Sequence, residues 1–271
     1  MNLEQDGFLS EQMTSVVQHV RALNPEWFAL ATRFSRVGQA FLAVQLNEQT
    51  NQGLADPRIL KLLIFYRATS NFQGAVVMAE RGMIAEARTL IRNCLECSLS
   101  LAALDTDPNH WKELLGDELA SRKARTKLLV GNPSWISHEQ LATLTKQLDD
   151  LEAKGKLAFI DVKKVAEKSP LVPMYLFYRQ LSADSAHLSV EALHRYIKSD
   201  PNDESSFDLQ WRPALDSNEV GDALSLATWV YLPSCVTLRD TFPDAGQEKE
   251  IKECAKAQID LANRYRSPGQ Q

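Results

Sequence analysis

The residues whose types best suit chemistry are arginine and histidine in the second half of the chain. Arg179 and His187 are separated by seven residues in a stretch where polar side chains interrupt an apolar run. A histidine can move a proton, and an arginine can stabilise the negative charge of a phosphorane. Metal-independent cleavage of RNA needs little more. If the protein is an enzyme, the candidate catalytic residues are therefore His187 with Arg179, or His187 with Arg92 brought near it by folding.

A metal site is a second chemical interpretation of the same stretch. His187, Glu191 and His194 follow at i, i+4 and i+7, so a continuous helix would place them on one face. A di-metal bundle also needs a second Glu-x-x-His pair, which the sequence lacks. Cys94 and Cys97 lie mid-helix without a second cysteine pair, and we expect them in the core. We therefore assign no metal ligand and no cofactor.

Another set of polar residues lies where an apolar helix face is expected. Arg88, Arg92 and Glu96 form a line at i, i+4 and i+8 along a helix that is otherwise mostly apolar. Such charges need partners, because an unpaired buried charge is strongly destabilising. The candidate binding residues are Arg88, Glu96, Tyr178 and Ser182. We expect one buried polar cluster, made of Arg92, Glu96, Tyr178, Ser182 and His187.

The elements that must position these residues are helices with clear start and stop signals. Asp56-Pro57 predicts the start of a long helix that ends at Arg81, before a left-handed turn at Gly82. A second long helix, from residue 84 to residue 105, follows almost at once, so the two must pack as an antiparallel hairpin. The predicted fold class is all-α, a helical bundle built on this hairpin. The one long irregular segment covers residues 199–218, and we expect a short extended piece near Phe207.

The chain of 271 residues is expected to have three parts. Residues 1–53 form an N-terminal helical appendage, bounded by the polar sequence NEQTNQG at 47–53. Residues 54–245 form the main helical domain. Residues 246–271 form a C-terminal helix with a frayed tail.

Charge and hydropathy exclude some classes of function. There are 35 acidic and 30 basic residues, and the net charge of -5 argues against a broad nucleic-acid-binding surface. No apolar run approaches the roughly 20 residues that cross a bilayer, and the first residues lack a signal-peptide pattern. We therefore expect a cytoplasmic protein without a membrane partner.

The two polar segments also carry a family resemblance. The combination E-A-x-x-L-I-R-N-x-x-E (86–96) with Y-x-x-L-S-x-x-x-x-H-x-S (178–189) resembles a bacterial family of all-helical domains of unknown function. This resemblance implies a helical fold and no particular chemistry. Arg92-Asn93 is also similar to the start of the arginine–histidine signature of HEPN domains, helical bundles that often act as RNases in toxin–antitoxin and phage-defence systems. Here no histidine follows Arg92 at that spacing, and the spacing from Arg179 to His187 exceeds it by one residue.

Three functions stay open at this point. The favoured one is a binding or regulatory module, because no catalytic signature is complete; a homo-oligomer and an RNA or protein partner are both compatible with it. The first alternative is a HEPN-like metal-independent RNase or toxin, acting in phage defence. The second is a small-molecule or metal enzyme that uses His187 and Glu191. The sequence does not decide whether the protein is an enzyme.

Overall fold

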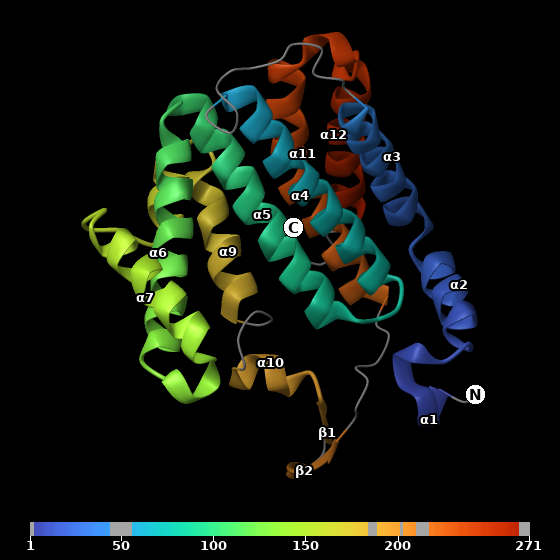
Figure 1. Ribbon diagram of the computed structural model, residues 1–271. Helices are drawn as coiled ribbons and strands as arrows, with labels where there is room; N and C mark the ends of the chain where they lie inside the picture. The colour runs from blue at the N-terminus through green and yellow to red at the C-terminus, as the bar shows by residue number, and fades with distance from the viewer. Residues whose placement is uncertain (1–2, 44–55, 184–188, 201–202, 210–216, 266–271) are drawn as a thin grey trace.

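The computed structural model describes residues 3–43, 56–183, 189–200, 203–209 and 217–265. Figure 1 shows the long helices α4, α5, α11 and α12 side by side, with α3 on one flank and the pair α6 and α7 on the opposite flank. The predicted all-α class is confirmed. The elements are α1 Leu3–Asp6, the 3-10 helix η1 Gly7–Leu9, α2 Met13–Leu23, α3 Pro25–Leu42, α4 Pro57–Ala79, α5 Ile84–Thr106, α6 His110–Val130, η3 Pro133–Trp135, α7 His138–Glu152, α8 Val162–Glu167, η4 Val172–Met174, α9 Tyr175–Leu181, α10 Val190–His194, β1 Ile197–Asp200, β2 Asp203–Leu209, α11 Ser217–Thr241, η6 Pro243–Ala245 and α12 Glu248–Tyr265.

Helix α4 starts where the sequence predicts and ends at Ala79, shortly before the predicted Arg81. The Asp56 carboxylate accepts a hydrogen bond from the backbone N–H of Arg58 at 2.8 Å, and Pro57 occupies the first helical position. Gly82 has a φ of 74°, the left-handed conformation that ends a helix at little steric cost to glycine. The chain can therefore reverse within a few residues and begin α5.

Contacts between α4 and α5 show how the two helices lie. Lys61, near the start of α4, forms an ion pair with Asp105, near the end of α5. Further along, Leu90 packs so closely on Gly74 that an added Cβ there would lie 3.0 Å from Leu90 Cδ1. The two helices therefore run antiparallel along their length.

The centre of the core is Tyr231 of α11. Its ring is stacked on Phe72, with centroids 4.5 Å apart, and on Phe65, at 5.7 Å, both from α4. Its hydroxyl lies 2.7 Å from Thr69 Oγ1, so the buried oxygen has a partner. Gly38 of α3 allows this approach, because a Cβ at that position would overlap the Tyr231 hydroxyl.

Helices from both ends of the chain contribute to the same hydrophobic core. The buried residues of α3 include Trp27, Phe34 and Phe41, and those of α12 include Ile251, Cys254 and Leu261. The core is therefore continuous from α3 to α12. The predicted boundaries after residues 53 and 245 stay predictions.

Helix α6 begins at His110, after a turn in which the Asp107 carboxylate accepts from the Asn109 N–H at 2.9 Å. The short extended piece expected near Phe207 is part of strand β2, which pairs antiparallel with β1, with Ile197 opposite Leu209. Among the described helices, none combines the length and apolarity needed to cross a membrane.

Candidate functional site

Four of the five residues expected to form a polar cluster contact one another where α9 meets α5. The Arg92 guanidinium donates from Nε to Ser182 Oγ at 2.8 Å and from Nη2 to the Tyr178 hydroxyl at 2.5 Å. Nη2 also lies 3.0 Å from Glu96 Oε1, one turn along α5. The guanidinium carbon is 4.6 Å from the centroid of the Tyr178 ring, which adds a cation–π contact. Arg92 thus joins α5 to Tyr178 of α9 and to Ser182, the C-cap of α9.

The Tyr178 hydroxyl interacts with both a cation and a carboxylate. It accepts a hydrogen bond from Arg92 Nη2, which also pairs with the nearby Glu96 carboxylate. Burial and the nearby Glu96 carboxylate raise the pKa of the Tyr178 phenol, although Arg92 acts in the opposite direction. The hydroxyl therefore stays protonated at neutral pH and can donate to Glu96 while it accepts from Arg92. This arrangement suits the joining of two helices and leaves Arg92 little capacity to hold a phosphate.

The other predicted site residues lie elsewhere. Arg179 is exposed on α9, and Arg88 is half-buried on α5, one turn before Arg92. His187 lies outside the described residues. The pairing of His187 with Arg92 or with Arg179 stays a prediction.

The metal-site interpretation assumed a continuous helix through His187, Glu191 and His194. That condition is not met, because Ser189 has extended backbone (φ −118°, ψ 160°) and its side chain caps α10 by accepting from the Ala192 N–H. Within the described ranges, no group of three or more histidine, cysteine, aspartate or glutamate side chains is placed to hold a metal ion.

A pocket of about 500 Å³ opens beside the polar cluster, between the α4–α5 hairpin and the elements α6, α8 and α9. Glu96 and Tyr178 belong to both the cluster and the pocket. The size, with apolar walls and a few polar groups, is typical of a small-molecule site. The apolar lining is Ile64, Leu114, Ile160, Val162 and Val165, and the polar lining is Arg67, Glu96, Cys97, Ser100, Asp117 and Tyr178.

Two opposite charges line this pocket from different helices. Arg67 of α4 is exposed, and Asp117 of α6 is half-buried, with Oδ1 accepting from the Ile160 N–H at 2.8 Å. In the part of the chain that the structure describes, neither side chain forms an ion pair. Burial raises the pKa of the Cys97 thiol to about 11, although Arg67 acts to lower it, so this thiol is neutral and a poor nucleophile at pH 7.

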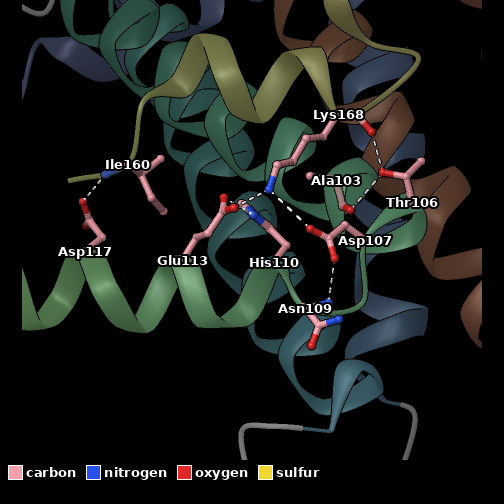
Figure 2. Close-up of polar contacts among 9 residues, drawn as sticks. All are labelled: Ala103, Thr106, Asp107, Asn109, His110, Glu113, Asp117, Ile160 and Lys168. Carbon is pink, nitrogen blue, oxygen red and sulfur yellow. Dashed lines mark hydrogen bonds and ion pairs between the residues drawn. The ribbon is translucent and has the colours of Figure 1, made fainter. Parts of the chain in front are cut away.

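The segment from Ile160 to Lys168 contributes one apolar wall of the pocket, and polar contacts hold it near both of its ends (Figure 2). At one end Asp117 accepts from the Ile160 N–H. At the other, Lys168 Nζ lies 3.3 Å from Asp107 Oδ2 and also binds the Glu113 carboxylate. These contacts attach the wall to α6 and to the turn that precedes it, and they fix the shape of the pocket before any ligand arrives.

His110 lies at the buried side of the Lys168 contacts (Figure 2). It is fully buried, and its Nδ1 lies 3.0 Å from Glu113 Oε2. Its Nε2 has no hydrogen-bond partner among the described residues, so protonation would bury an unsatisfied N–H. Burial lowers the pKa of His110, although Glu113 acts to raise it. The neutral imidazole, donating from Nδ1 to Glu113, fits this site.

We expect His110 to make the stability of the protein depend on pH. The unfolded chain takes up a proton near the ordinary histidine pKa of 6.5, whereas folded His110 does so only at lower pH. The unfolded state therefore binds more protons below pH 6.5, and the free energy of unfolding should fall as the pH drops below that value. Urea unfolding at about pH 7.5 and about pH 5.5 should show this loss in wild type and in the exposed-site control His138→Phe, and a smaller loss in His110→Phe. The same loss in all three proteins would contradict the assignment.

Arg67, Asp117 and the segment from Ile160 to Val165 are pocket groups that the sequence pattern does not reveal. Arg67 directly follows the apolar run from Leu62 to Tyr66, which is the one local signal. Asp117 and the wall from Ile160 to Val165 have no local signal, because they reach the pocket only through the placement of α6 and α8. The His110–Glu113 pair has the i, i+3 spacing of helix neighbours, but its partner Lys168 is distant in sequence.

Comparison with known proteins gives one match. The model of a family described as "Family of unknown function (DUF5677)" matches residues 58–205. No curated protein and no solved structure matches the chain. A match to the HEPN domains is not among these findings. The matched span includes every residue that lines the pocket, from Ile64 to Tyr178.

Proposed function

The chain belongs to the DUF5677 family of unknown function, and from this premise we propose that it is a binding module whose site is the pocket between α4, α5, α6, α8 and α9. The observation that carries the proposal is the pocket itself, which is lined by aliphatic side chains together with the polar groups of Arg67, Asp117, Glu96 and Tyr178. Such a lining suits a small amphipathic molecule.

Binding accounts for these groups better than catalysis does. The Cys97 thiol and the Tyr178 phenol both have a raised pKa, so neither is ionised at neutral pH to act as a nucleophile or base. Arg92 already donates to Ser182, Tyr178 and the Asn93 side chain and pairs with Glu96, which favours a positioning role over the stabilisation of a transition state.

The contacts around the pocket also favour binding because they preorganise it. Arg92 fixes Tyr178 on one side, and Asp117 with Lys168 fixes the wall from Ile160 onwards on the other. A site that is already shaped loses less conformational entropy when a ligand enters, so more of the contact energy appears as affinity.

A pair of matched serine variants tests the proposal. Ser100 lines the pocket, whereas Ser70 is exposed on α4 outside it, so Ser100→Phe and Ser70→Phe add the same ring inside and outside the site. We expect some members of a panel of small amphipathic molecules to raise the melting temperature of wild type and of Ser70→Phe, and not that of Ser100→Phe. A ligand at a hundredfold excess over its Kd adds about 2.7 kcal/mol to the free energy of unfolding, a shift of several degrees.

The outcomes of this test are distinct. Stabilisation of all three proteins by the same molecules would place binding outside the pocket. If no molecule of the panel raises the melting temperature of wild type, the result contradicts the proposed binding function. The HEPN-like alternative gives another result: wild type would cleave RNA without added metal, and His187→Ala would lose cleavage at an unchanged melting temperature.

A further inference from the structure

We infer that the pocket takes a small zwitterion with an apolar body, a carboxylate that meets Arg67 and an ammonium that meets Asp117. An apolar α-amino acid is the simplest molecule of this class. The inference rests on the proposed function, because it names the ligand of that same site.

The charged side chains that line the pocket differ in their partners. Glu96 is already paired with Arg92. Arg67 and Asp117 line the same pocket, on α4 and α6, and among the described residues they form no ion pair with each other or with another side chain. A ligand with both charges can pair with both side chains, whereas a ligand with one charge leaves one of them without an opposite charge.

Asp117 and Arg67 can each bind one charged group of the ligand. Asp117 Oδ1 accepts from the Ile160 N–H, which orients the carboxylate and leaves Oδ2 for an ammonium donor. Arg67 carries five N–H donors at the exposed side of the pocket, and a guanidinium binds a carboxylate with two parallel hydrogen bonds.

The apolar part of the pocket lining is aliphatic. Every apolar lining residue carries a branched aliphatic side chain. A hydrocarbon side chain on the ligand would be buried there, while its charged groups stay at Arg67 and Asp117. Because Arg67 belongs to α4 and Asp117 to α6, the ligand would also connect α6, which packs mainly on α7, to the α4–α5 hairpin.

The test uses two matched series of probes on the full chain. One consists of L-leucine, N-acetyl-L-leucine and 3-methylbutylamine; the other consists of L-phenylalanine, N-acetyl-L-phenylalanine and 2-phenylethylamine. The N-acetyl forms lack the ammonium and the amines lack the carboxylate, while the apolar body is kept. We expect calorimetry to show that one of the two amino acids binds at least about tenfold more tightly than both of its single-charge relatives, because each lost charged hydrogen bond weakens binding by that order.

Two variants assign the charges to the residues. Asp117→Asn retains an oxygen that can accept from the Ile160 N–H, so it removes the charge and not the contact. This variant should bind the amino acid and the amine about tenfold more weakly than wild type, and the N-acetyl form with unchanged affinity. Arg67→Ala should bind the amino acid and the N-acetyl form more weakly than wild type, and the amine with unchanged affinity. Arg36→Ala, at an exposed arginine of α3, should change none of these affinities.

The results separate the ligand class from the site. Equal affinity for the three members of each series, or losses in Arg67→Ala and Asp117→Asn that do not follow the charge of the probe, would overturn the zwitterion. If none of the six probes binds, while another amphipath stabilises wild type and not Ser100→Phe, the zwitterion is wrong and the site stands. If no amphipath of any charge binds, both proposals fail.

Discussion

Tyr231→Ala is expected to lower the free energy of unfolding by about 3–5 kcal/mol. The ring is fully buried and stacked between Phe72 and Phe65, so its removal leaves a cavity that fixed helices on both sides cannot fill. Denaturant unfolding measures the loss. Tyr66→Ala, at an exposed tyrosine of α4, should cost less than about 1 kcal/mol.

A conservative variant separates the ring of Tyr231 from its hydroxyl. Tyr231→Phe keeps the stacked ring and removes the bond to Thr69, whose hydroxyl still donates to the Phe65 carbonyl oxygen at 2.9 Å. It should therefore cost only about 1 kcal/mol. A loss in Tyr231→Ala no larger than that in Tyr231→Phe would show that the stacked rings are not the centre of the core.

Arg92→Ala is expected to lower the free energy of unfolding by about 2–3 kcal/mol. The substitution removes the bonds to Ser182 and Tyr178 and leaves the Glu96 carboxylate, whose side chain is only 35% exposed, without its cation. Partial exposure keeps the expected loss below that of a fully buried pair. Urea unfolding measures this loss, and hydrogen exchange should show reduced protection in α9.

The matched control for Arg92 is Arg179, which is exposed on α9. Arg179→Ala should change the free energy of unfolding by no more than about 0.5 kcal/mol. Arg92→Lys keeps the charge but lacks the planar fork that reaches three partners, so it should lie between the two. If Arg92→Ala and Arg179→Ala cost the same, the cluster does not hold α9 on α5.

The sequence predicts best those features that depend on neighbouring residues. Asp56-Pro57 marks the start of α4, and Gly82 marks the turn that follows it. The contact between Arg92 and Tyr178 is less local, but it follows from the rule that polar groups on apolar helix faces need partners.

The features that the sequence did not predict depend on residues far apart in the chain. The pocket forms only when α6 and the segment from Ile160 onwards come to lie beside α4 and α5. The residues next to Arg67 and Asp117 in the sequence do not indicate that these two side chains line one pocket. The pairing of β1 with β2 is set by backbone hydrogen bonds between strands, which no helical period reveals. The break before α10 depends on Ser189, whose extended backbone interrupts a stretch with helical spacing.

A crystal structure of the protein with the probe that raises its melting temperature most would test directly whether the pocket between α5 and the segment from Ile160 to Val165 is a binding site. We expect the probe in that pocket, with its apolar body against Val162 and Val165 and its polar groups at Arg67 and Asp117. A probe bound elsewhere on the protein, with the pocket unchanged, would contradict the account.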